Sequence, residues 1–276
     1  MLPDLFFTIN YWIVIGLAII SLILCLLFID VIVAHRECHN STNLLTCNTC
    51  AAVGVYFIFR MVESIYALRG DWQDHQSTCI FRAYCILGLI GALCYSFPIQ
   101  TISRLFFTVF YKHKFLVTWR AHWILIVISW IISFLLPIEP LLIQNGFELR
   151  IESRNCVVGS NITSITMYLI VTMFVIPISI MTTIYSVILY HVYRSTRRVA
   201  PTTAVSTIAT TAQGKLSGAN GRRELRIIHR MLVQTAILSC GGMLYMILAI
   251  WNAVQQQPPP ESLYLLRSIF SSRTIR

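Results

Sequence analysis

Long apolar runs separated by short polar stretches make up most of this chain. A helix needs about 20 residues to cross a hydrocarbon core of roughly 30 Å. Six runs are long enough, and they occupy approximately residues 12–34, 44–67, 80–110, 121–142, 165–192 and 226–252. The pattern therefore predicts an all-α membrane protein with at least six spanning helices.

A further apolar segment begins at Ser262 with the sequence SLYLLRSIF, and the printed chain ends at Arg276. At about 1.5 Å per residue, a helix over this segment would reach only ~22 Å. We therefore expect a seven-transmembrane helix bundle whose seventh helix is truncated. Residues 1–11 are predicted to form the amino-terminal segment, and residues 12–276 a single helical membrane domain.

The distribution of Lys and Arg predicts the orientation. The loops after the first, third and fifth runs hold 12 of these residues, whereas the amino terminus and the loops after the second and fourth hold 3. Cytoplasmic loops of membrane proteins are enriched in Lys and Arg. The amino terminus is therefore predicted to be extracellular, in the plasma membrane. Residues 194–223, which are polar with basic ends, are predicted to form a flexible cytoplasmic loop.

Composition supports the membrane assignment and excludes other classes. The chain is 57% hydrophobic and 12% charged, whereas soluble domains are about 45–50% apolar and about 25% charged. The net charge of +10 comes without a basic and aromatic repeat or a groove-reading motif, so no nucleic-acid partner is expected. The seven histidines are scattered, and no nucleophile motif, phosphate loop or pair of carboxylates accompanies them. We expect neither an enzyme nor a cofactor.

One charge stands inside the third apolar run. Arg104 has no acidic residue within 10 positions, and a charge in a spanning segment is costly enough to indicate function. Cys79 lies 25 residues before Arg104, and Trp72 lies 7 residues before Cys79. These separations place a cysteine and an arginine near the opposite ends of one helix.

Similar pairs occur on the next two runs. Trp130 lies 10 residues before Pro140, and Pro177 lies 8 residues before Tyr185. Cys156 is the only cysteine between these two runs. In this order and on these spans, the residues make the chain resemble the rhodopsin-like, class A G-protein-coupled receptors.

The resemblance implies a receptor that transmits an extracellular ligand signal to a heterotrimeric G protein. It implies a disulfide between Cys79 and Cys156, although two free buried thiols are the alternative. Arg104 would be the arginine of the family's Asp/Glu-Arg-Tyr motif and would face the G protein. Tyr185, on the helix that carries Pro177, would move toward it on activation.

Departures from the family pattern are also informative. Ser103 stands where the family has an acid, so the ion pair that restrains the arginine is lost and raised basal activity is predicted. Val53 stands where a sodium-binding aspartate is usual, and residues 240–242 are Cys-Gly-Gly where a tryptophan and a proline are usual. The Asn-Pro-x-x-Tyr motif of the seventh helix is not found before Arg276. A non-signalling truncated receptor, acting as an interaction or decoy partner, is therefore the alternative.

Four residues on the second and third runs are candidates for a ligand pocket. Arg60 and Glu63 are three positions apart on one helix face, close enough to pair. The pair is either purely structural or, together with Arg82, part of a polar pocket. Ile86 stands where amine receptors carry an aspartate, so the ligand is expected to be a peptide or another molecule that is not a biogenic amine.

Two further motifs have simple interpretations. Asn161 begins an Asn-x-Thr sequon in a predicted outer loop and is a glycosylation candidate, whereas Asn40 is better interpreted as a helix cap. Cys47 and Cys50, with the His and Cys residues of 35–39, could suggest zinc by ligand type. The two cysteines lie at the start of an apolar helix, and the upstream residues lack a regular ligand spacing, so no metal site is expected. Membrane lipid is the remaining expected partner.

Overall fold

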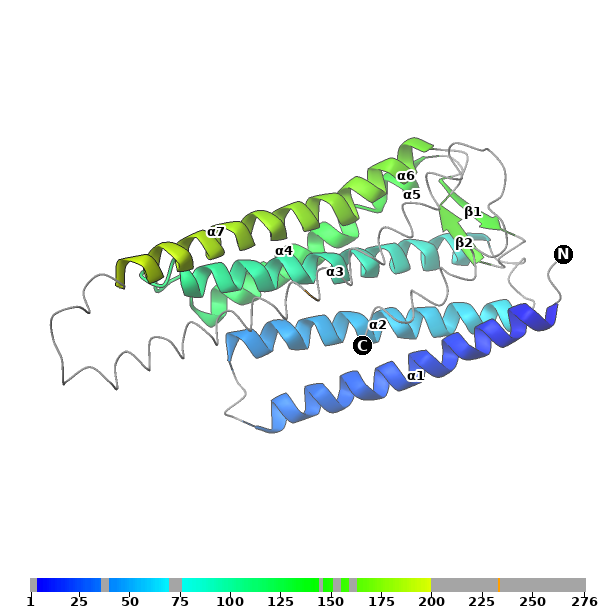
Figure 1. Ribbon diagram of the computed structural model, residues 1–276. Coiled ribbons are helices and arrows are strands. Elements are labelled where there is room, and N and C mark those ends of the chain that lie inside the picture. The colour runs from blue at the N-terminus through cyan, green and yellow to red at the C-terminus, as the bar shows by residue number, and fades with distance from the viewer. Residues whose placement is uncertain are drawn as a thin grey trace.

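The computed structural model describes residues 4–35, 40–69, 76–143, 146–150, 155–158, 163–199 and 233. Long helices lie side by side along most of its length (Figure 1). In chain order the elements are α1 (Asp4–Ala34), α2 (Ser41–Arg69), α3 (Gln76–Thr108), α4 (Trp119–Leu135), α5 (Ile138–Leu142), strands β1 (Phe147–Arg150) and β2 (Asn155–Val158), α6 (Thr163–Ile170), the π-helical turn η3 (Val171–Val175), and α7 (Ile176–Val199).

Five segments of the described chain are long and apolar enough to cross a membrane. They are Thr8–Ala34, Ser41–Arg69, Thr78–Thr108, Trp119–Leu142 and Ser164–His191, which confirms the first five predicted spans. The predicted span at 226–252 and the segment that starts at Ser262 lie outside the described residues. Residues 194–199 of the predicted loop 194–223 continue α7, and residues 200–223 lie outside the described residues. Helix α1 begins at Asp4 and so includes most of residues 1–11.

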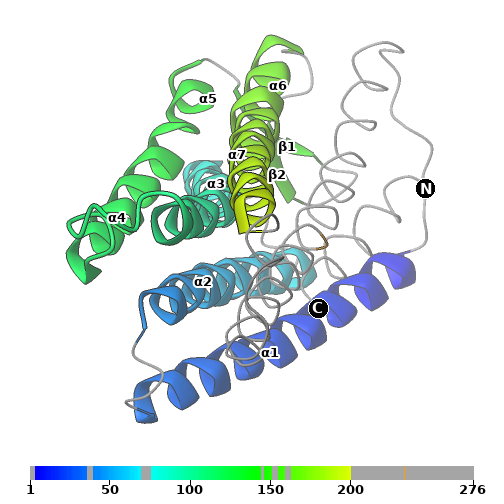
Figure 2. The same cartoon turned by 60° about the vertical axis from the view of Figure 1, so that its left-hand side comes forward.

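Helix α3 is central to the described bundle. It contacts α2, α4 and α7 and also both strands, and Figure 2 shows it between α4 and α7 with α2 alongside. Half of the residues in the apolar segment of α3 are buried inside the bundle, compared with 11% for α1, which packs mainly on α2. The large apolar side chains that α1 exposes suit contact with lipid acyl chains, which accept them at no cost.

Polar side chains between the helices pair with one another. The Trp130 indole N–H donates to the Asn48 side-chain oxygen at 2.8 Å and joins α4 to α2. The Gln100 amide donates to the Thr49 hydroxyl at 2.9 Å and joins α3 to α2. Each such bond stabilises helix packing inside a membrane by about 1 kcal/mol.

The turn η3 has a local cause and a tertiary partner. The Ile176 N–H bonds to the Val171 carbonyl, five residues back, and so does not reach the Thr172 carbonyl. The next residue is Pro177, which has no N–H to offer. The Tyr95 hydroxyl of α3 donates to the Thr172 carbonyl instead, at 2.9 Å. The wide turn therefore exposes a backbone acceptor that fixes this segment against α3.

One element departs from the all-α expectation. Strands β1 and β2 form an antiparallel hairpin at the end of the bundle where α1 begins, and Leu149 pairs with Cys156. The four-residue strands lie between apolar runs and are too short for a periodic signal. We call this end the hairpin end. The opposite end, where α3 finishes at Thr108, is called the Arg104 end.

Close contact between α3 and α4 predicts a size limit at Gly88. A methyl group there would lie 2.8 Å from ring atoms of Phe134, a side chain that also stacks with Trp130. We expect Gly88→Ala to lower the free energy of unfolding by about 1–3 kcal/mol. Gly16, with nothing within 4 Å of a methyl group, is the matched control. Thermal unfolding of the purified variants tests this, and equal effects at both sites would contradict the packing argument.

Candidate functional site

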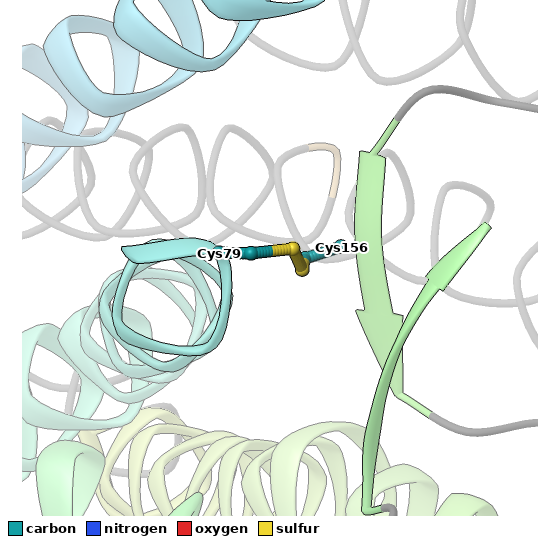
Figure 3. Close-up of a disulfide and its surroundings, with 2 residues drawn as sticks. All are labelled: Cys79 and Cys156. Atoms are coloured by element: carbon teal, nitrogen blue, oxygen red, sulfur yellow. A yellow bond between two sulfur atoms is a disulfide. The ribbon is translucent and has the colours of Figure 1, made fainter. Parts of the chain in front are cut away.

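A disulfide joins Cys79, in the first turn of α3, to Cys156 on β2 (Figure 3). The two Cα atoms are 5.6 Å apart, within the usual range for this bond. The sulfur of Cys79 is turned toward the strand, and the bond fixes the hairpin against α3. The predicted pairing is thus present, and the reading of these two residues as free thiols is wrong.

At the Arg104 end, Ser103 is bonded to a histidine that the sequence did not single out. The Ser103 hydroxyl lies 2.8 Å from His122 Nε2, and His122 Nδ1 lies 2.8 Å from the Thr118 carbonyl oxygen. A carbonyl can only accept, so Nδ1 carries the hydrogen. In the neutral ring, Nε2 then accepts from Ser103. His122 is completely buried, and the ring of Phe107 stacks on it.

Local sequence explains why His122 reaches Ser103. Thr118 is the N-cap of α4, and its hydroxyl accepts the Ala121 N–H. The cap sets where α4 begins, and His122, one turn further, then lies beside its own Thr118 carbonyl. Residue 103, which is an acid in the receptor family that the chain resembles, is therefore a serine whose hydroxyl binds His122 of α4.

Arg104 is half-buried and lies four residues before the end of α3. The Tyr185 hydroxyl of α7 lies 3.2 Å from the Thr101 hydroxyl, one turn before Arg104, and Tyr185 is close enough to interact electrostatically with Arg104. In the described part of the chain, Arg104 forms no ion pair. Pro177 is buried two turns before Tyr185 on the same helix. Arg104 and Tyr185 thus lie near each other in this arrangement, and the movement of Tyr185 toward Arg104 on activation stays a prediction.

The ligand-pocket candidates lie on α2 and α3. Arg60 and Glu63 form an ion pair, and Glu63 is only 7% exposed. The Arg82 guanidinium lies over the Tyr66 ring, 4.3 Å from its centroid. Ile86 is buried in an apolar cluster that joins α1, α2 and α3. The predicted pairing of Arg60 with Glu63 is therefore present, and Arg82 lies in a different environment, against an aromatic ring. A role of these residues in a ligand pocket stays a prediction.

The remaining sequence candidates divide into described and undescribed positions. Asn40 lies at the N-cap position of α2, because its carbonyl accepts the Leu44 N–H at 3.0 Å, and its side-chain oxygen accepts the Ser41 N–H at 3.1 Å. Val53 is buried on α2. Within the described ranges no three potential metal ligands come together. Asn161, Trp72 and residues 240–242 lie outside the described residues.

The Ser103–His122 contact predicts an energetic coupling between α3 and α4. Ser103→Ala and His122→Phe each remove the hydrogen bond, and phenylalanine keeps a ring stacked on Phe107. We expect the double variant to be more stable than the sum of the single effects implies, by about 1 kcal/mol. Thermal unfolding of the four proteins gives this number. A coupling near zero would mean that the contact contributes no stability.

Comparison with known proteins identifies a receptor family. Residues 24–272 match the model of the family described as 7 transmembrane receptor (rhodopsin family). The matched range covers most of the 276 residues, including the disulfide and Arg104. No curated protein matches the chain at a significant level.

Proposed function

Because the chain belongs to the rhodopsin family of seven-transmembrane receptors, we propose that it transmits the binding of an extracellular ligand to a heterotrimeric G protein. The observation that carries this proposal is Arg104. Its guanidinium lies near one end of the bundle, beside Tyr185 and without a carboxylate partner in the described residues. A charge held in this way can be offered to a docking protein.

Two independent features support an orientation with the Arg104 end in the cytoplasm of a plasma-membrane protein. The disulfide at the hairpin end requires an oxidising compartment, which the cell exterior and the secretory pathway provide. Lys112 and Lys114 lie between α3 and α4, and Arg120 lies in the first turn of α4, all at the Arg104 end, and basic residues are enriched on the cytoplasmic side of membrane proteins. Asn161 would then be an external glycosylation site.

Signalling would be a shift between two arrangements of the same bundle. A ligand that binds better to the active arrangement increases its population, whatever the order of binding and movement. In the described arrangement the Tyr185 hydroxyl bonds to Thr101, one turn from Arg104. Exchange of that bond for a contact with Arg104 would tie α7 to α3 in a new position. The Arg104 end would then open toward the G protein.

The candidate pocket favours a ligand other than a biogenic amine. Ile86 offers no carboxylate for an ammonium group, and Glu63 is already paired with Arg60. These residues fit a peptide or another non-amine ligand better. Such a ligand would enter from the hairpin end and contact Arg60, Glu63, Arg82 and Ile86.

Ser103 predicts basal activity that a carboxylate should suppress. Residue 103 is a serine, and its hydroxyl binds His122. No acid next to Arg104 in the sequence is therefore available to hold Arg104 in the resting state. The test is guanine-nucleotide exchange by a panel of G proteins on the purified chain in lipid nanodiscs, without added ligand. We expect exchange above that of empty discs, and a several-fold decrease for Ser103→Asp.

Ser103→Asn is the matched control because it has the size of aspartate without its charge. It should leave more basal exchange than Ser103→Asp when both are normalised to folded receptor. Equal loss in the two variants would assign the effect to packing around His122. No exchange above empty discs with any G protein of the panel would count against basal coupling.

A further inference from the structure

We infer that Arg82 is the anion-recognition group of the ligand site, and that the ligand carries a carboxylate or phosphate. This inference rests on the proposed receptor function and names the chemical class of its ligand. It follows from a comparison of the two arginines that lie on neighbouring helices, Arg60 on α2 and Arg82 on α3.

The Arg82 guanidinium is desolvated on one side and has no acceptor there. Its Nη1 atom is buried, and no hydrogen-bond acceptor of the described chain reaches it. Buried polar atoms are nearly always hydrogen-bonded, and an unsatisfied charged donor is especially costly. A residue that persists in this condition indicates a partner that the described residues do not contain.

Arg60 provides the contrast within the same protein. Its guanidinium is paired with Glu63, and Glu63 lies one turn along the same helix face with only 7% of its surface exposed. The charges of Arg60 and Glu63 therefore neutralise each other within the chain. Of the three charged groups in this set, one positive charge remains, and it is on Arg82.

The Tyr66 ring lies against the Arg82 guanidinium. Arg82 Cζ lies 4.3 Å from the ring centroid, a stacking distance at which the ring face attracts the cation. A guanidinium carries N–H donors in a planar fork that matches two oxygens of a carboxylate or phosphate. The face of the Tyr66 ring attracts the charge but supplies no oxygen acceptor to the buried Nη1. The Arg82 guanidinium is thus suited to an oxyanion.

The position of Arg82 suits a ligand that enters from the hairpin end. It lies three residues after Cys79, whose disulfide fixes the start of α3 against the hairpin. Arg82 itself is half-buried, so part of the side chain remains accessible. One turn further along α3, Ile86 belongs to the apolar cluster with Tyr56 and Phe57. An anion with an apolar body therefore fits best.

The first experiment compares Arg82→Met with Arg60→Met in the full-length chain in lipid nanodiscs, with thermal unfolding as the readout. Methionine keeps most of the aliphatic volume of arginine and removes the charge. Without added anions we expect Arg82→Met to unfold ~2–4 °C higher than the parent, because an unpartnered buried charge is gone. Arg60→Met should unfold lower, since it leaves the Glu63 carboxylate buried and unpaired.

The second experiment adds octyl phosphate and octanoate as probes, with 1-octanol and octylammonium as matched uncharged and cationic molecules. Either anion should raise the unfolding temperature of the parent in a saturable way and leave that of Arg82→Met unchanged. The larger shift identifies phosphate or carboxylate as the preferred head group. Octanol and octylammonium should have little effect on either protein.

Three results would overturn the inference. One is an Arg82→Met variant that unfolds as low as Arg60→Met or fails to fold, because Arg82 would then be satisfied within the chain. The others are anions that stabilise parent and variant equally, or that act no better than octanol. None of these readouts involves a G protein. Anion binding through Arg82 in a chain without nucleotide exchange, with or without the bound anion, would therefore count against coupling to a G protein and keep the anion site.

Discussion

Replacement of Cys79 by serine is expected to remove most of the folded protein from the membrane. The bond to Cys156 closes a sequence separation of 77 residues. A closure of this length stabilises a fold by roughly 4 kcal/mol in the chain-entropy account. Total stabilities are only about 5–15 kcal/mol, so this is a large share. The measurement is the amount of monodisperse, detergent-solubilised protein at equal expression, and Cys156→Ser should behave like Cys79→Ser.

Two controls make the disulfide result specific. Cys85 is a buried free cysteine on the same helix, and Cys85→Ser tests the substitution without loss of a cross-link. The double variant of Cys79 and Cys156 should be no worse than either single variant, because one bond is lost in all three. Additive losses in the double variant, or a similar loss for Cys85→Ser, would show that the cysteines contribute separately.

Replacement of Arg104 by alanine is expected to reduce G-protein activation at least tenfold with little change in the amount of folded protein. A charge-assisted hydrogen bond to a docked partner contributes about 1.5–3 kcal/mol, which corresponds to roughly tenfold to a hundredfold. Stability should change little because Arg104 is half-buried and has no ion-pair partner in the described residues. Nucleotide exchange per folded receptor is the measurement.

Arg120 is the matched control for Arg104. It is exposed, lies in the second position of α4 at the same end of the bundle, and carries the same charge. Arg120→Ala should keep most of the exchange activity. If Arg104→Ala retains parental activity, or if both alanine variants lose it equally, Arg104 has no special role in coupling.

The membrane-spanning helices were the most predictable part of the fold. An apolar run of about 20 residues allows few alternatives to a spanning helix. The first and last residues of these helices were less predictable. The third span, predicted at 80–110, belongs to a helix from Gln76 to Thr108. Helices extend beyond the hydrocarbon into polar surroundings, where hydropathy no longer indicates their boundaries. Thr118, as a side-chain cap, fixes one such boundary locally.

The contacts of the candidate site were only partly predictable. The separation of Cys79 from Arg104, together with the family resemblance, predicted the disulfide and the place of Arg104. His122 was overlooked because its contact with Ser103 depends on the rotation of α4 about its axis, which no sequence spacing records. The spacing of Arg60 and Glu63 predicted their ion pair, which the structure contains. The unpartnered Nη1 of Arg82 was not predictable for the same reason as the His122 contact, because only packing shows that it is buried without an acceptor in the described residues.

The most direct test of the central claim asks which end of the bundle binds a G protein. A photo-crosslinking phenylalanine analogue can replace Tyr111 at the Arg104 end or Phe81 at the hairpin end, both 61% exposed. We predict that position 111 captures the Gα subunit in the nucleotide-free state, that a GTP analogue prevents the capture, and that position 81 captures none. Capture from position 81, equal capture from both, or none from position 111 would contradict the account.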